Sequence, residues 1–183
     1  MELKLIPHRF LQYPIDPNIE TLIIGTFNPE TEKNPAEIFY GRSRNHLWKL
    51  LPLALGAEDL KGKDSKDKLD FIKKHKVGFI DLVAEVRVDA GSETNYGNDY
   101  IDSRVTKWRD VISEMKKMKR LKKVCFTRKT FSGIPQVKER VIDLEHYCKR
   151  RQLPFQCLST PARIYSKSKQ EEWTNFFSGS ANS

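Results

Sequence analysis

The segment from Phe39 to Leu51, FYGRSRNHLWKLL, combines residue types that could hold a planar ring. Phe39 and Tyr40 offer aromatic faces on which a base can stack, and Gly41 leaves room beside them. Asn45 stands at the head of a helical pattern, where its side chain can cap backbone N–H groups. The segment therefore predicts one wall of a pocket for a planar ring, followed by a helix.

A second polar candidate follows the first apolar run, in the sequence Gly25-Thr26-Phe27-Asn28-Pro29. Glycine lets the backbone bend or approach a ligand, and Pro29 fixes the direction of the chain. The segment lacks the glycine spacing and lysine of a P-loop and the G-x-G-x-x-G of a dinucleotide site. Asn28 is then either a turn residue before proline or a side chain at the mouth of a crevice. Because an amide does not titrate, Asn28 can orient a reactant but cannot act as a general base.

A carboxylate, Asp81, stands near the end of the apolar run FIDLV. It is either an exposed strand-end or capping carboxylate, or a group that faces a bound base. A carboxylate facing a base would accept N–H donors and repel carbonyl oxygens, and it could also hold water. The residue pattern leaves both alternatives open.

Four short apolar runs have the length of a strand, and they predict buried strands over 21–25, 77–83, 123–126 and 155–158. Apolar residues at helical spacing lie between the runs and predict helices over 47–55, 101–115 and 137–148. Alternation of strand and helix predicts an α/β fold, a three-layer α/β/α sandwich around a short, mostly parallel four-stranded sheet. In such sheets ligands bind outside the carboxyl ends of the strands, so we expect the segments 25–29, 81–85, 127–129 and 159–163 to meet at one crevice.

The chain is basic, with 33 Lys and Arg against 24 Asp and Glu and a formal net charge of +9. The region from Lys107 to Arg151 contains fifteen Lys and Arg and five Asp and Glu, and so carries the whole excess. Such a region is either a set of solvated helix faces or a one-sided surface for a polyanion.

Cysteine and histidine spacing gives no sign of a disulfide framework or a metal site. Cys125, Cys148 and Cys157 lie far apart among apolar neighbours, and the four histidines form no cluster with them. We therefore predict no metal, and core thiols in a reducing compartment. The sequence shows neither a secretory leader nor an apolar run that would span a bilayer, which predicts a cytoplasmic protein. The expected organisation is a single domain over 1–177 and a disordered tail over 178–183.

Four segments together resemble the ordered motifs of the uracil-DNA glycosylase superfamily. In chain order they are GTFNP, FYGRSRNHLWKLL, KVGFIDLV and LSTPARIYS. The aromatic-Gly-x-x-x-Asn-x-x-Trp part, which includes Asn45 and Trp48, is the most specific match. The mismatch-specific uracil/thymine-DNA glycosylases and the hypoxanthine-DNA glycosylase-like group are the branches that the chain resembles most. The resemblance implies a three-layer fold, binding of DNA with the target nucleotide flipped out, and hydrolysis of its N-glycosidic bond.

The same resemblance implies roles for residues of the pocket. The implied base-binding residues are Gly25, Thr26, Phe27, Tyr40 and Asn45, with Tyr40 in the stacking position. Asn28 is similar to the Asn that positions the attacking water in the mismatch-specific branch, although Phe27 is an additional residue before it. Asp81 stands where thymine-type relatives carry a base-contacting Asn and hypoxanthine-type relatives often carry Asp. Asn28 and Asp81 are therefore the expected catalytic residues.

In the family, the last motif is a loop that pinches the phosphate backbone and pushes a side chain into the gap left by the flipped base. Either Arg163 or Ile164 is the expected wedge. The full set of implied DNA-binding residues is Arg42, Arg128, Lys129, Ser159, Thr160, Arg163 and Ile164. Two features depart from the family pattern: the last motif contains no His, and Thr127 stands where hypoxanthine-type relatives tend to have an Asn-Gly turn.

The favoured interpretation is a monofunctional DNA glycosylase of base excision repair that removes uracil or another deaminated or mismatched base. The alternative is a catalytically altered or inactive nucleic-acid-binding member of the same fold, which is supported by the missing His, the shifted position of Asn28 and the substitution at Thr127. A small α/β hydrolase is disfavoured because the chain has no G-x-S-x-G elbow. We expect DNA as the partner, no cofactor, no membrane association and a monomeric protein. The sequence leaves open which base is excised and whether the DNA is single- or double-stranded.

Overall fold

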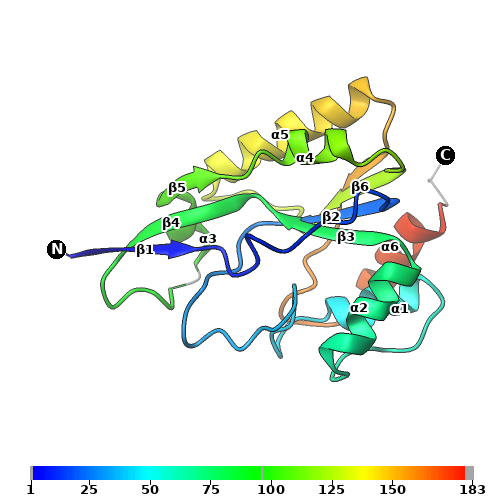
Figure 1. Cartoon of the computed structure of the whole chain (residues 1–183), viewed down its shortest axis with the longest axis horizontal. Helices are drawn as coiled ribbons and strands as arrows, with labels where there is room; N and C mark the ends of the chain where they lie inside the picture. Colours follow the sequence, from blue (N-terminus) through cyan, green and yellow to red (C-terminus); the bar gives the residue numbers. More distant parts are fainter. Residues whose placement is uncertain (1, 96, 180–183) are drawn as a thin grey trace.

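The computed structural model describes residues 2–95 and 97–179. Within these residues, parallel strands form a four-stranded sheet in the order β3-β2-β6-β7 (Figure 1). The strands are β2 (Thr21–Gly25), β3 (Val77–Asp81), β6 (Lys123–Phe126) and β7 (Phe155–Cys157). The sequence predicted a strand at each of these positions, but the run 77–83 is interrupted at Leu82 and the last strand ends before Leu158.

Helices cover both faces of this sheet and give the predicted three-layer α/β/α arrangement (Figure 1). On one face lie α4 (Val111–Lys117) and α5 (Pro135–Arg150). On the other lie α1 (Leu47–Ala54), α2 (Ser65–Lys74) and α6 (Lys167–Ser178). Successive strand residues point to opposite faces, so Leu22 and Ile24 pack in the core under α5 whereas Ile23 packs in the core under α1 and α6.

A second sheet, which the sequence did not predict, is antiparallel and has the order β1-β4-β5. It contains β1 (Leu3–Pro7), β4 (Val83–Asp89) and β5 (Val105–Trp108). The chain leaves the parallel sheet at Leu82 and enters β4 at once, so the expected loop over 81–85 is mostly strand. β1 then brings His8 to an isolated β-bridge with Pro29, at the carboxyl end of β2.

The predicted helix over 101–115 is wrong. The chain there forms the end of α3 (Asn98–Asp102), then β5, then α4. Val105 and Trp108 have β-branched and aromatic side chains, and their segment pairs with β4. Asp110 accepts the N–H of Ser113 at 3.0 Å and begins a new helix. Apolar residues of α3, β5 and α4 all pack in one core, and their spacing along the sequence happens to resemble that of a single helix.

The last helix is longer than the domain prediction assumed. α6 continues through Ser178, and Gly179 ends it with φ 74°, a left-handed conformation that favours glycine. The predicted tail therefore begins inside a helix, and residues 180–183 lie outside the described residues. The assignment of a single domain over 1–177 stays a prediction.

Candidate active site at the carboxyl ends of the strands

Gly25 is the point where two functional side chains meet. It ends β2 and pairs in register with Asp81, which ends the neighbouring strand β3. A Cβ atom added to Gly25 would lie 2.6 Å from the Tyr40 hydroxyl and closer still to Asp81 Oδ1. Only glycine fits here, because even a Cβ atom would overlap the carboxylate and the phenol oxygen that pack against the backbone. The structure thus brings together three of the residues that the sequence named.

Asp81 is buried, with 4% of its surface exposed, and its Oδ2 lies 2.7 Å from His8 Nε2. His8 Nδ1 accepts the backbone N–H of Phe10 at 3.0 Å. Because Nδ1 is an acceptor, the proton of the neutral ring is on Nε2, and His8 donates it to the carboxylate. The sequence analysis missed His8, since its partner lies 73 residues away and no local pattern marks the pair.

A cation, Arg109, also lies near this carboxylate. Burial lowers the pKa of Arg109, and the negative charge of Asp81 opposes that shift. Arg109 follows β5, and its backbone N–H donates to Leu82 O at 2.8 Å. The second sheet therefore supplies Asp81 with a hydrogen-bond donor, His8, and with a positive charge.

Tyr40 is held by its hydroxyl group. The hydroxyl lies 3.2 Å from Thr127 Oγ1, and that oxygen lies 3.3 Å from Ile24 O, which can only accept. Thr127 therefore donates to Ile24, and Tyr40 donates to Thr127. Burial and the nearby charge of Asp81 raise the pKa of Tyr40 well above its ordinary value, so the phenol stays protonated. Thr127, which the sequence suggested only as a departure, orients this phenol, whereas stacking on the Tyr40 ring stays a prediction.

The backbone of the predicted pocket wall is partly engaged within the protein. Gly25 O and Thr26 O accept the N–H groups of Leu82 and Val83, each at 3.0 Å. The Phe27 ring lies 5.9 Å from the His8 ring, centroid to centroid. Phe27 thus encloses the imidazole, and base binding by Gly25, Thr26 and Phe27 stays a prediction.

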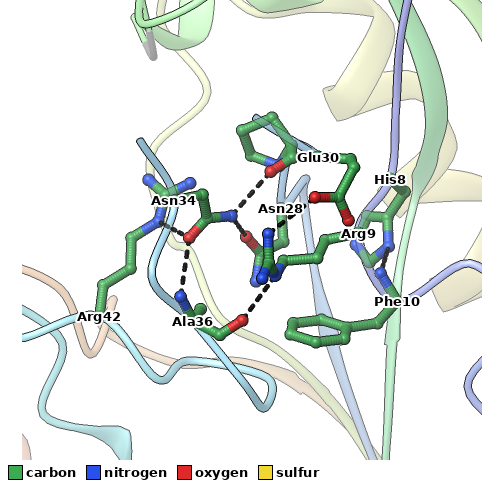
Figure 2. A network of polar contacts seen from close by, with 9 residues as sticks. His8, Arg9, Phe10, Asn28, Glu30, Asn34, Ala36 and Arg42 are labelled. Atoms are coloured by element: carbon green, nitrogen blue, oxygen red, sulfur yellow. Dashed lines mark hydrogen bonds and ion pairs between the residues drawn. The ribbon is translucent and has the colours of Figure 1, made fainter. Parts of the chain in front are cut away.

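Asn28 belongs to a neighbouring network of amides, shown in Figure 2. It is buried, and its Oδ1 accepts from Asn34 Nδ2 at 2.6 Å. Asn34 Nδ2 also donates to Pro29 O at 2.7 Å, and Asn34 Oδ1 accepts from Ala36 N and Arg42 Nε at 3.2 and 3.3 Å. These two donors fix the orientation of the Asn34 amide, and therefore that of Asn28. Asn34 is a second residue that the sequence analysis missed.

Arg9, next to His8 in the chain, anchors the Asn28 network (Figure 2). Its backbone N–H donates to Asn28 O at 2.8 Å, and its Nε donates to Ala36 O at 2.6 Å. Its Nη1 also forms an ion pair with Glu30 at 2.7 Å. The segment after β1 therefore supports both Asp81 and Asn28.

The N-cap residue of helix α1 is His46, whose side chain makes no capping hydrogen bond, and the predicted cap, Asn45, lies one residue before it. Asn45 Oδ1 accepts the N–H of Leu47 at 2.9 Å. The segment around it lies beside the last motif, because His46 N donates to Pro161 O at 2.8 Å and Arg163 N donates to Arg44 O at 2.9 Å. Backbone hydrogen bonds thus join the segment around Asn45 to the last motif. Contact of Asn45 with a base stays a prediction.

The last motif exposes the two residues predicted as wedges. Ile164 is 73% exposed, which is unusual for a large apolar side chain, and Arg163 is exposed with φ 71°. Lys169 Nζ donates to Ala162 O at 3.2 Å and to Ile164 O at 2.6 Å, and so braces the loop from α6. Both candidates are thus exposed on a braced loop, and the choice between Arg163 and Ile164 as the wedge stays a prediction.

Other predicted DNA-binding residues have partners inside the protein. Lys129 forms an ion pair with Glu172 at 2.8 Å, and Glu172 also accepts the N–H of Ser159 at 3.1 Å. Thr160 Oγ1 accepts the N–H of Ala162 at 3.3 Å. Burial lowers the pKa of Arg128, and the positive charge of Arg163 lowers it further, which places the two arginines close together. DNA contact by all of these residues, and by Arg42, stays a prediction.

A cavity of about 950 Å³ lies against β7 and α6 rather than at Gly25, Asp81 and Tyr40. Its wall includes Phe155 on β7, Glu172 and Phe176 on α6, and the predicted DNA-binding residues Lys129 and Ser159. Its lining contains neither Gly25 nor Asp81 nor Tyr40.

Among residues 2–95 and 97–179, no group of three or more His, Cys, Asp or Glu is placed to hold a metal ion. No described helix is long and apolar enough to cross a membrane.

Comparisons with known proteins find similarity to DNA glycosylases. No protein-family profile matches the chain. A hypoxanthine DNA glycosylase of Methanosarcina acetivorans is 26% identical over 165 residues, which cover 89% of this chain and 93% of the relative. A hypoxanthine DNA glycosylase of Methanosarcina barkeri is 27% identical over 88 residues, which cover 48% of this chain and 54% of the relative.

A similar fold occurs in the solution NMR structure of a candidate uracil DNA glycosylase from Methanosarcina acetivorans. The TM-score is 0.61 at 19% sequence identity, and the superposition covers 96% of this chain and 97% of the other. At this identity the likeness shows the fold.

Proposed function

We propose that this chain, a member of the uracil-DNA glycosylase superfamily by its motifs and its fold, is a DNA glycosylase that excises deaminated bases. The reaction is hydrolysis of the N-glycosidic bond of a flipped-out nucleotide. One observation carries the proposal: Asp81 Oδ1 and the Tyr40 hydroxyl converge at Gly25, where the loops of the family motifs meet. The similarity to proteins named hypoxanthine DNA glycosylases supports it.

The polarity of the two groups favours deaminated bases. Tyr40 directs its proton toward Thr127, and Asp81 Oδ1 is a carboxylate oxygen, so both present acceptors to the gap at Gly25. Deamination of adenine or cytosine converts a ring nitrogen from an acceptor into an N–H donor. A floor of acceptors therefore favours hypoxanthine and uracil over the parent bases.

Asn28 would orient the attacking water. Its amide does not titrate, so it positions the water without removing a proton. The hydrogen bond from Asn34 uses one lone pair of Asn28 Oδ1 and leaves the second available. Since no His in the last motif assists departure of the base, we expect slow turnover and a preference for good leaving groups.

DNA would be held by the loops around the pocket. Ile164 would fill the space in the duplex left by the flipped base. The Tyr40 hydroxyl would face the edge of that base. The net charge of +9 supports attraction of the phosphate backbone, with strong dependence on salt.

A direct assay tests the proposal. The protein is incubated with short duplexes and single strands that carry uracil, hypoxanthine, xanthine or mismatched thymine, and alkali-labile abasic sites are scored. Cleavage of at least one deaminated substrate, with undamaged DNA left intact, is the expected result. Retention of every base on every substrate would refute the proposal.

A second candidate is a DNA-binding protein of the same fold without glycosylase activity. The observation that favours it is the engagement of Asn28 Oδ1 by Asn34 in a buried network. For this candidate, the same duplexes would be bound in a gel-shift assay and none would be cleaved.

A further inference from the structure

The imidazole of His8 is buried and is directed at a single oxygen of Asp81. Its side chain is fully buried, and the Nε2–Oδ2 distance is 2.7 Å. We propose that His8 is a positioning residue, which holds Asp81 so that Oδ1 faces the base at Gly25. This inference rests on the proposed glycosylase function and adds a residue that lies outside the four family-like motifs.

The geometry leaves His8 one hydrogen-bonding arrangement. Nδ1 accepts from the Phe10 N–H at 3.0 Å, so the ring donates from Nε2 to Asp81. The rings of Phe10, Phe27 and Phe39 surround it with centroid distances of 6.2, 5.9 and 5.8 Å. Rotation of the imidazole would break both hydrogen bonds inside this aromatic enclosure.

The backbone of His8 is as firmly placed as its ring. His8 N donates to Ala84 O at 2.8 Å, and His8 pairs with Pro29 in an isolated β-bridge. The donor therefore directly follows β1 of the second sheet, while the acceptor ends a strand of the first sheet. A hydrogen bond between two such supports fixes the plane of the carboxylate.

A neutral donor suits this task because it leaves the charge on Asp81. A charge-assisted hydrogen bond from a neutral N–H stabilises the carboxylate, and one of its oxygens remains free to accept from a base. Without the donor, a buried carboxylate would lose its partner and change orientation. The effect should appear in the chemical step more than in DNA binding, since His8 is buried and cannot touch DNA.

Two variants separate this role from a structural one, because each keeps one of the two hydrogen bonds of His8. His8→Asn keeps an acceptor near the Nδ1 position for Phe10 N–H but loses the donor to Asp81. His8→Gln keeps a donor near the Nε2 position but loses the acceptor. Single-turnover rates and duplex affinities are measured for both, together with melting temperatures.

If His8 positions Asp81, His8→Asn lowers the single-turnover rate about 10- to 100-fold, the range for loss of a hydrogen bond to a charged group, and leaves duplex affinity nearly unchanged. His8→Gln retains most of the wild-type rate. Equal losses in both variants, a loss confined to His8→Gln, or wild-type rates in both would each overturn the inference.

A measurement on the wild-type protein keeps the inference testable if the variants do not fold or if the protein shows no activity. Two-bond ¹H–¹⁵N NMR spectra of the histidine rings should show His8 as the neutral Nε2–H form. A Nδ1–H form or an imidazolium at neutral pH would overturn the inference even if excision occurs. Absence of excision by the wild type would instead refute the proposed function, and the ring signal would still report whether His8 donates to Asp81.

Discussion

The two ends of the parallel sheet carry polar groups in contrasting surroundings. Before the amino end of β2, Glu20 forms ion pairs with Lys76 at 2.8 Å and with Lys122 at 2.6 Å, and all three side chains reach solvent. At the carboxyl ends, Asp81 is buried and its bonded partner is a neutral imidazole. The same strands therefore lead from an exposed charge cluster to an enclosed polar one.

This contrast separates stability from chemistry. Exposed ion pairs contribute little to the free energy of unfolding, because water and salt screen their charges. A buried carboxylate must be hydrogen-bonded, and its remaining oxygen interacts strongly with any donor that enters. The exposed cluster can thus be altered at small cost, whereas each atom of the buried cluster should affect excision.

Substitution of Asn28 should have the largest effect. We expect Asn28→Ala to lower excision about 100- to 1000-fold or more, because the attacking water loses its orienting group, while DNA binding stays nearly intact. Single-turnover excision and gel-shift affinity measure the two quantities, and Asn18→Ala, at an exposed position, is the matched control. Survival of activity would mean that water is held elsewhere, with Asp81 as the first suspect.

Substitution of Asp81 should follow. We expect Asp81→Asn to reduce excision about 100-fold, because an amide of the same shape lacks the charge and presents a donor as well as an acceptor. The fold reduction in excision of hypoxanthine and uracil should exceed the fold change in affinity for undamaged duplex. Asp70→Asn, on exposed α2, is the control, and equal activities of the two variants would make Asp81 an ordinary strand-end carboxylate.

Filling the gap at Gly25 should have an intermediate effect. The Cβ of Gly25→Ala would lie 2.6 Å from the Tyr40 hydroxyl and would overlap Asp81 Oδ1, so both must move. We expect about a tenfold loss of excision and a loss of about 1–3 kcal/mol in the free energy of unfolding. Gly97→Ala is the control, because its Cβ would closely approach only exposed side-chain oxygens, of Asn95 at 3.1 Å and Asp99 at 3.2 Å, and it should leave excision unchanged at a smaller cost in stability. Normal excision by the Gly25 variant would show that no ligand uses this gap.

The exposed cluster should give the smallest effect. Hydrogen bonds from Lys122 and Lys76 lower the pKa of Glu20 from 4.5 to about 2. A pKa lowered in the folded state means that the stabilisation is present above about pH 4.5 and is lost as the pH falls toward 2. We expect Glu20→Gln to lower the melting temperature slightly at pH 7 and to leave excision unchanged. A difference in melting temperature that does not shrink on acidification would contradict this assignment.

Much of the sheet could be predicted because its strands have local signatures. The runs 21–25 and 123–126 are apolar and of strand length, and they form strands with the predicted bounds. The antiparallel sheet was missed although β4 carries a local signal, because Val86, Arg87 and Val88 alternate between buried and exposed. The half-exposed β5 has no such signal and depends on its pairing with β4. The spacing of Val105 and Trp108 is compatible with a helix, and it is the pairing of their segment with β4 that makes it a strand.

The candidate site divides in the same way. Asp81 and Gly25 were expected to lie together because both follow strands of one parallel sheet, and the register places them side by side. The partners that orient the site were not visible, since Tyr40 and Thr127 are 87 residues apart, as His8 and Asp81 are 73. Such pairs leave no periodic pattern in the sequence.

The amino-acid sequence by itself determined the central layers, the motif-bearing loops and the residue types at the ends of β2 and β3, because these depend on local periodicity and on the direction of parallel strands. Only the tertiary structure decided which polar atoms meet. Those contacts depend on how the second sheet packs against the first, which places His8 behind Asp81 and the Tyr40 hydroxyl beside it.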